Sequence, residues 1–444
     1  MSKTNQRYSR RRFLAGSSLI AASQLFAPPM LRAQSGSRSK TLRLLRWKNF
    51  VPAYEIWFND VFVENWGREN DTDVIVTNVG MGEIGQHAQA DIAAGEGHDL
   101  VLFLSPKPSL EDHTIDHREL HEECERRFGK AHAFVNRSNV NPRNGRHHGF
   151  IEGFIPTLQV YRKDIWDAVG TRHATWDDIR SGGRAAKLLH DAPVGISFAP
   201  EHNAEHSLRA LMAAFGSAVQ DAQSRPALAS KRTLDALKFG KALFEETMPP
   251  EVLKWTPPSN NLAVLSGEIG LTIDTMSIIR AAEANKVPIE PQLALAELPE
   301  GPFGRGGPTY GTNTFVIWKF ARNIDGAQKF LLDYMGALGD GLRHNGFQIM
   351  PSYPGAVPDI ADRLQSQADR PGRYDLLVNL PETLTNLGHP GFSNAATDDV
   401  LNSRIISNMF ASVASGRVGA EDAMVDAQAR IVPIFDRWRE AGKI

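Results

Sequence analysis

Short apolar runs alternate with helix-spaced apolar faces over the first third of the chain. Runs at 41–47, 73–79 and 99–104 predict three strands. Between them, 52–66 begins with proline and carries apolar residues at helical spacing, and a second helix is predicted at 84–94. The run at 99–104 is unbroken, as is typical of a strand buried on both faces. This β-α-β-α-β order predicts a lobe with a parallel sheet.

The chain is expected to pass between two lobes twice. Apolar, β-branched and aromatic strands are predicted at 154–161 and at 309–319, and the second follows a glycine-rich loop. Two such crossings imply two lobes joined by a hinge, and ligands favour the interface between domains. The predicted lobes comprise residues 41–155 plus 313–355 and residues 156–312 plus 356–444.

The second lobe is also expected to be α/β. Its predicted strands are 193–199, 269–273 and 292–298. Its predicted helices begin at Trp176 and otherwise span 204–215, 231–246, 400–415 and 420–439.

Four segments resemble one known family in their order and spacing. They are IPTLQVYRKDIWDAVG at 155–170, TWDDI at 175–179, NTFVIWKFARNIDGAQKFLLDYM at 313–335 and ASGRVGAEDAMVDAQARI at 414–431. The family is extracellular solute-binding protein family 1, which includes maltose-binding protein and related sugar binders. The resemblance implies a periplasmic-binding-protein-like α/β fold with two lobes joined by a hinge of crossing strands. It also implies a monomeric binder without cofactor or enzymatic activity that delivers a small solute to the membrane permease of an ABC transporter.

The candidate ligand-binding residues lie at strand ends and in the loops after them. Ligands bind at the carboxyl ends of parallel strands, and aromatic rings stack on the C–H faces of sugars. The candidates are Trp47, Phe50, Glu83, Phe103, Ser105, Phe198, Trp255, Asp274, Tyr310 and Asn313. The resemblance places the family's ligand-contacting loops at Trp47, Glu83, Phe103 with Ser105, and Tyr310 to Asn313. A sugar or polyol is the expected solute, and a polyamine held by Glu83 and Asp274 is the alternative within this class.

A second class of function is suggested by the loop after the second strand. Gly80-Met81-Gly82-Glu83-Ile84-Gly85 matches the glycine pattern that holds a dinucleotide diphosphate at a helix start. That fold also needs an acid at the end of the next strand to bind the ribose. Asp99 comes before its apolar run, so it lies at the wrong edge of the sheet. A twin-arginine-exported dinucleotide-dependent oxidoreductase is therefore the alternative, and a structural periplasmic protein without ligand is a third hypothesis.

Other candidate chemistry is sparse. His113, His117 and His121 are spaced four apart, and Cys124 follows, which would suit a metal site on one helix face. Acidic residues interleave with them and favour a solvated helix instead, and no metal is expected. The same acids would raise the pKa of Cys124, so a catalytic thiol is not expected. No G-x-S-x-G nucleophile pattern is present.

The first 33 residues predict an export signal. Ser9-Arg10-Arg11-Arg12-Phe13-Leu14 matches the twin-arginine pattern, and a modest apolar run follows to Leu31. The segment 1–33 holds six basic residues and no acid, so its removal takes the formal net charge from −2 to −8. An acidic mature chain is a poor nucleic-acid binder. The sequence thus predicts a periplasmic protein.

Overall fold

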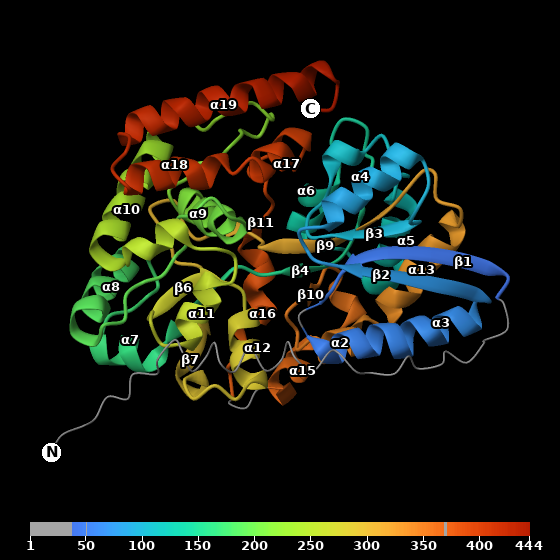
Figure 1. The fold of residues 1–444 in the computed structure, drawn as a ribbon, viewed down its shortest axis with the longest axis horizontal. Coiled ribbons are helices and arrows are strands. Elements are labelled where there is room, and N and C mark those ends of the chain that lie inside the picture. The colour runs from blue at the N-terminus through green and yellow to red at the C-terminus, as the bar shows by residue number, and fades with distance from the viewer. Residues whose placement is uncertain (1–37, 50, 368–370) are drawn as a thin grey trace, which may run out of the picture.

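The protein folds into two α/β lobes that lie side by side (Figure 1). The computed structural model describes residues 38–49, 51–367 and 371–444. The predicted export signal at 1–33 and the candidate ligand residue Phe50 lie outside the described residues.

A six-stranded mixed sheet forms the centre of the N-terminal lobe. Three parallel strands stand where the sequence predicts them, and three antiparallel strands extend the sheet beside the third. The order is β10 (Met350–Pro351), β4 (Phe150–Ile155), β9 (Gly311–Ile317), β3 (Leu100–Phe103), β1 (Lys40–Trp47) and β2 (Thr72–Val79). The loops after β1, β2 and β3 therefore lie at one edge of the sheet.

Helices cover this sheet, and their ends follow local signals. Pro52 begins the first one, and Gly95, with a φ of +65°, ends α4 in the left-handed region that favours glycine. The predicted helix at 52–66 forms with one π-helical stretch, Trp57–Val63, between α2 and α3. The helices of this lobe are α2 (Pro52–Ile56), α3 (Glu64–Glu69), α4 (Ile84–Ala94), α5 (Arg118–Phe128), α6 (Ala133–Asn139), α13 (Ile324–Gly336) and α14 (Leu338–His344).

The first crossing is two strands rather than the single strand predicted at 154–161. β4 ends at Ile155 and β5 (Leu158–Arg162) begins after Pro156, whose ring nitrogen cannot donate to a ladder. β4 pairs with β9 in the N-terminal lobe, whereas β5 pairs with β6 (Leu271–Asp274) and β7 (Leu293–Ala296). The short link at 156–157 thus joins the two sheets.

The C-terminal lobe packs helices around the antiparallel three-stranded sheet β6-β5-β7. The predicted strand at 193–199 forms no ladder in the described structure, where Val194 makes only an isolated bridge to Leu271. The predicted helix at 400–415 is two helices, because Arg404 takes a φ of +56° between them. The helices are α7 (Lys163–Val169), α8 (Trp176–His190), α9 (His202–Ala214), α10 (Lys231–Thr247), α11 (Ser259–Leu265), α12 (Ser277–Ala284), α17 (Ala395–Asn402), α18 (Ile405–Ala414) and α19 (Ala420–Glu440).

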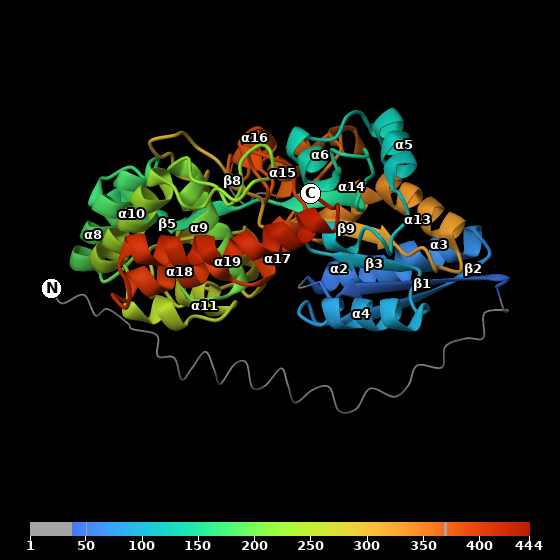
Figure 2. The same cartoon turned by 90° about the horizontal axis from the view of Figure 1, so that it is seen from above.

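Short elements complete the interface between the lobes. β8 (Gly307–Pro308) pairs with β11 (Leu384–Thr385) just before the chain enters β9, and α15 (Ile360–Gln367) and α16 (Leu376–Asn379) lie between β10 and β11 in the sequence. Viewed from above, α17 lies at the boundary between the lobes (Figure 2). No helix within the described ranges is long and apolar enough to cross a membrane.

Candidate functional site

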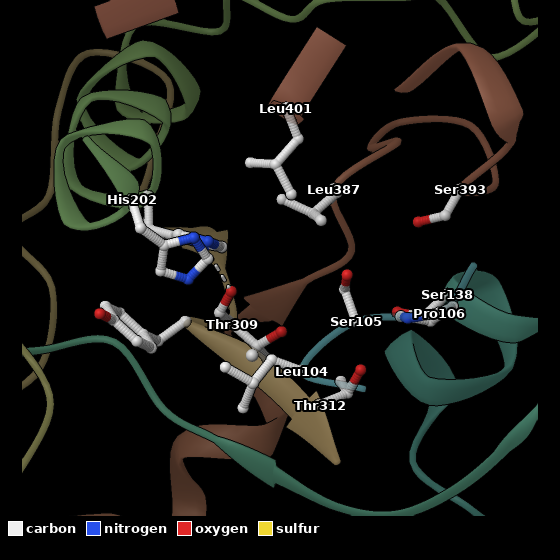
Figure 3. Close-up of a pocket in the computed structure, with 13 residues that line it drawn as sticks. Leu104, Ser105, Pro106, Ser138, His202, Thr309, Thr312, Leu387, Ser393 and Leu401 are labelled. Atoms are coloured by element: carbon white, nitrogen blue, oxygen red, sulfur yellow. Dashed lines mark hydrogen bonds between the residues drawn. The ribbon is translucent and has the colours of Figure 1, made fainter. Parts of the chain in front are cut away.

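A small cavity lies where the two lobes meet. It takes residues from the loop after β3, from α6 and α9, from the segment that enters β9, from the chain before α17 and from α17 itself (Figure 3). Its volume is about 20 Å³, which is room for about one water molecule. The lining residues are Leu104, Ser105, Pro106, Ser138, His202, His206, Thr309, Tyr310, Gly311, Thr312, Leu387, Ser393 and Leu401.

The lining combines hydroxyl groups with apolar and aromatic surface. Six hydroxyl-bearing side chains take part, namely Ser105, Ser138, Thr309, Tyr310, Thr312 and Ser393. Two imidazoles and three leucines complete most of the wall. No Asp, Glu, Lys or Arg is among the described residues that line the cavity. Such a wall can bind hydroxyl groups and C–H faces but offers no counter-charge to an ion.

The start of α9 fixes the imidazoles. The carboxylate of Glu201 caps this helix, accepting hydrogen bonds of 2.7 Å from the backbone N–H groups of Asn203 and Ala204. His202 and His206 follow one turn apart on the same face, with ring centroids separated by 4.6 Å. The ring of Tyr310 lies 5.1 Å from each of them. Three rings from two segments therefore form one wall.

Both imidazoles are neutral at physiological pH. Burial lowers the pKa of His202 to about 4. Burial also lowers the pKa of His206 well below its ordinary value, and the neighbouring His202 lowers it further. Burial raises the pKa of Tyr310 well above its ordinary value, so its hydroxyl stays protonated. The wall carries no charge and keeps its capacity for hydrogen bonds.

Asp274 does not line the cavity but supports this wall from behind. It lies at the end of β6, is 5% exposed, and accepts hydrogen bonds from the side chain of Asn260, from Asn203 (3.4 Å) and from the backbone N–H of Thr275 (2.6 Å). Burial raises its pKa to about 6. Because Asn203 belongs to α9, this cluster connects the end of β6 to the helix that carries the imidazoles.

The two lobes are joined around the cavity by polar contacts. Lys107 and Ser109, in the loop after β3, both bind the carboxylate of Asp398 in α17. The backbone N–H of Ser393 donates to the carbonyl of Arg137 at 2.9 Å. Near the C-terminus, Lys443 pairs with Asp112. These contacts hold the lobes together on the side of α17.

Of the predicted ligand residues, Ser105 and Tyr310 line the cavity. Trp47 and Phe103 stand at the ends of β1 and β3 but are only 4% and 5% exposed, within the core around the large sheet. Phe198 is buried in the core of the C-terminal lobe, 5.9 Å from the ring of Phe244. These three aromatic side chains are not brought to the cavity.

Three other predicted residues also lie elsewhere. Trp255 is half-buried and packs against both cores. Asn313 points into the N-terminal lobe, where its amide donates to Glu152 at 2.7 Å. Glu83 is exposed at the start of α4. Asp274, described above, supports the wall without lining it.

Sequence inspection missed His202 and His206. A signal was available, because residues four apart share one face of a helix, but the predicted helix began at 204 and left His202 outside it. That pattern alone could not tell a cavity wall from a core position, because the answer depends on how α9 packs against the segment that enters β9.

The Gly80–Gly85 loop does not fit a dinucleotide. The carboxylate of Glu83 accepts a hydrogen bond of 2.6 Å from the Gly80 N–H, in the loop that would hold the diphosphate. A carboxylate at that position repels a phosphate group. The loop therefore gives no support to the oxidoreductase alternative.

In the histidine-rich stretch, His117 and His121 are packed into the N-terminal lobe rather than solvated as predicted, whereas His113 is exposed. His113 precedes α5, His117 accepts a hydrogen bond of 3.0 Å from the Ile317 N–H, and the His121 Nδ1 lies 2.8 Å from the Tyr353 hydroxyl. Burial raises the pKa of Cys124 to about 12, which keeps the thiol protonated. No cluster of His, Cys, Asp and Glu able to hold a metal ion occurs in the described ranges.

Two α/β lobes joined by crossing strands define the fold of the periplasmic solute-binding proteins. The model of the family of bacterial extracellular solute-binding proteins matches residues 149–336. The predicted resemblance to this family and its fold is thereby confirmed. No curated protein sequence matches the chain.

Solved structures of the same fold cover nearly all of the described chain. Maltose-bound MalE3 of T. maritima has 17% identity and a TM-score of 0.73, with 88% of this chain and 99% of that chain covered. A sugar transporter protein of Arthrobacter chlorophenolicus A6 with bound laminaribiose has 12% identity and a TM-score of 0.74 (88% and 98% covered). A solute-binding protein of Agrobacterium radiobacter K84 in complex with ribitol has 14% identity and a TM-score of 0.70 (90% and 100% covered).

Proposed function

We propose that this protein captures a sugar or polyol between its lobes and delivers it to the membrane permease of an ABC transporter. The observation that carries the proposal is the composition of the cavity wall, which offers hydroxyls, neutral imidazoles and a tyrosine ring but no charged side chain among the described residues. Neutral polyhydroxylated solutes satisfy such a wall by hydrogen bonding and stacking. The three solved structures named above have maltose, laminaribiose and ribitol bound.

The wall disfavours a polyamine. A buried ammonium group needs a carboxylate partner, because an unpaired buried charge is costly. Glu83 is exposed and bound to Gly80, and Asp274 is enclosed by amide and backbone donors behind the wall. Neither of the two acids on which the polyamine alternative depends lines the cavity.

Capture requires the lobes to move. A cavity of about 20 Å³ is too small for a sugar, so we infer that the lobes separate to admit the solute and close upon it. The links at 156–157 and 309–310 are the proposed hinge, with lobe boundaries at residues 155/156 and 312/313. The closed form then gains stability from solute contacts that the open form lacks.

The remaining features of the proposal follow from this mode of action. The protein acts as a periplasmic monomer without cofactor or catalysis, exported by the twin-arginine signal at 1–33. The permease distinguishes the closed, loaded form from the open one. The description of the matching family as extracellular supports this location.

Thermal unfolding of residues 34–444 tests the proposal. The panel contains maltose, laminaribiose, ribitol, the diamine putrescine and NAD. A solute at about 100 times its dissociation constant should stabilise the fold by about 2.7 kcal/mol. Stabilisation by a neutral sugar or polyol alone is the expected result. Stabilisation by putrescine or NAD alone contradicts the proposal, and a flat response across a wider panel of neutral sugars and polyols would overturn it.

A further inference from the structure

Two nitrogens on the cavity wall, Nε2 of His202 and Nε2 of His206, have no hydrogen-bond partner among the described residues. The Nε2 atom of His206 is buried, and none of the described residues bonds to it. The whole residue is 1% exposed. A buried acceptor without a donor loses the hydrogen bond that it makes with water in the unfolded chain. A hydrogen-bond donor for His206 Nε2 must therefore come from another molecule.

The protonation of this imidazole is fixed by the backbone. The His206 Nδ1 lies 3.0 Å from the carbonyl oxygen of Thr309, the residue before Tyr310 at the entry to β9. A carbonyl oxygen only accepts, so Nδ1 carries the proton and donates it. In a neutral imidazole the other nitrogen is then an acceptor. The dashed line of Figure 3 marks this bond at Thr309, and the side chain of His202 projects into the same space.

The surroundings keep Nε2 unprotonated. Burial, the neighbouring His202 and the positive charges of Arg209 and Arg404 all lower the pKa of His206. The ring of Tyr310 packs against His206, and its hydroxyl stays protonated. The one interaction that favours protonation is the bond to Thr309, which is satisfied by the neutral form as well.

We propose that His206 Nε2 accepts a hydrogen bond from a hydroxyl group of the bound solute and so determines which solutes are held. The proposal rests on the proposed function and adds a requirement to it: the solute must present an O–H donor to this atom. An analogue with hydrogen or a methoxy group at that position leaves Nε2 unpaired. A solute ammonium is a poor substitute, because no described carboxylate lines the cavity to balance its charge.

Replacing His206 by asparagine or by glutamine distinguishes the roles of its two ring nitrogens. In His206→Asn the short amide takes the place of Nδ1, so the bond to Thr309 can persist while the acceptor at Nε2 is lost. In His206→Gln the longer amide reaches the position of Nε2 and restores an acceptor there. The control is His190→Asn, at the exposed end of α8 away from the cavity wall.

The experiment measures affinities by calorimetry for whichever of maltose, laminaribiose and ribitol binds the unsubstituted protein. We expect His206→Asn to weaken binding roughly 10- to 100-fold, His206→Gln to recover most of that loss, and His190→Asn to bind normally. Equal affinity of His206→Asn and the unsubstituted protein overturns the inference and leaves the proposed function intact.

Nitrogen-15 NMR of the unsubstituted protein gives an independent measurement. We expect the His206 signals to show the Nδ1–H tautomer, and the Nε2 resonance to shift upfield when the solute binds. An Nε2–H tautomer in the complex overturns the inference even if a substituted protein fails to fold. If no neutral solute of a wider panel binds at all, the proposed function and this inference fail together.

Discussion

The ammonium group of Lys107 lies 2.8 Å from the carboxylate of Asp398, and this contact joins the two lobes. Lys107 follows β3 in the N-terminal lobe, whereas Asp398 lies in the first turn of α17. The Ser109 hydroxyl donates to the second carboxylate oxygen at 2.9 Å. The two charged side chains are only 17% and 5% exposed, so water screens the pair little. The contact is placed to stabilise the closed arrangement of the lobes.

Replacing Asp398 by asparagine should favour the open form. The substitution removes a charge-assisted interaction that exists only between closed lobes, for a cost of about 2 kcal/mol. We expect weaker solute binding and a larger radius of gyration by small-angle X-ray scattering of the unliganded protein. The control is Asp235→Asn, whose partner Lys231 is 86% exposed and whose loss should change neither quantity. If scattering and affinity are unchanged in Asp398→Asn, the Lys107–Asp398 contact does not stabilise the closed form.

Glu205 should be essential to the stability of the C-terminal lobe. Its side chain is fully buried, lies 3.4 Å from the buried Arg209, and accepts hydrogen bonds from the backbone N–H and hydroxyl of Ser407. Glu205→Ala leaves the Arg209 charge unpaired in the core, and we expect a loss of about 3–5 kcal/mol in the free energy of unfolding. Urea denaturation measures this loss. Glu245→Ala, at an exposed pair with Lys241, should cost less than about 1 kcal/mol, and a similar loss in both variants would contradict the argument.

Glu152 should make stability fall as the pH rises towards 7. Burial raises its pKa to about 7 from the ordinary 4.5, so between these values the folded chain holds a proton that the unfolded chain has released. Over that interval the free energy of unfolding decreases by up to about 3 kcal/mol, and above pH 7 this contribution stays constant.

The Glu152→Gln substitution tests whether Glu152 causes this decrease in the free energy of unfolding. Glutamine keeps the oxygen that accepts from Asn313 and has no proton to release. We expect the substituted protein to match the original near pH 4.5 and to exceed it in stability at pH 8, as measured by denaturation across the pH range. A parallel pH profile for the two proteins would show that Glu152 does not titrate in this way.

Among the predicted aromatic residues that the structure describes, Tyr310 reaches the cavity, so it should contribute to solute affinity. Tyr310→Ala removes the ring that packs against His202 and His206, and we expect binding to weaken by about 1–3 kcal/mol. Isothermal titration calorimetry measures the loss. Phe303→Ala removes a ring that is 56% exposed and away from the cavity wall, and it should leave affinity unchanged. If both variants bind equally well, Tyr310 does not contact the solute.

Local sequence signals were sufficient for most elements of the fold. The alternation of apolar runs and helical faces placed β1, β2 and α4 within a residue of their bounds, because strand and helix periods differ and proline and glycine mark their ends. Two crossing segments then implied two lobes. The prediction was wrong at three places. Pro156 divides the strand predicted at 154–161, and the left-handed backbone at Arg404 divides the helix predicted at 400–415. The segment 193–199 forms no ladder, because a strand needs a partner along its length.

The candidate site was only partly predictable. The rule that ligands gather at strand ends led from the sequence to Ser105 and Tyr310, both on the cavity wall. The same rule selected Trp47, Phe103 and Phe198, whose rings are buried in the two cores. Side chains at a strand end can face either the core or the cleft, and burial of a large ring favours the core wherever space exists there.

The sequence by itself determined the two-lobed α/β fold, because hydrophobic periodicity and the residues that end helices and strands can be recognised within short segments of the chain. The tertiary structure decided that His202 and His206 meet Tyr310 and that Lys107 meets Asp398. These pairs are separated by about 100 residues or more. The first contact depends on how α9 packs against the segment that enters β9, and the second depends on how one lobe docks against the other. No local pattern encodes either contact, because each depends on packing summed over many residues that are distant in the sequence.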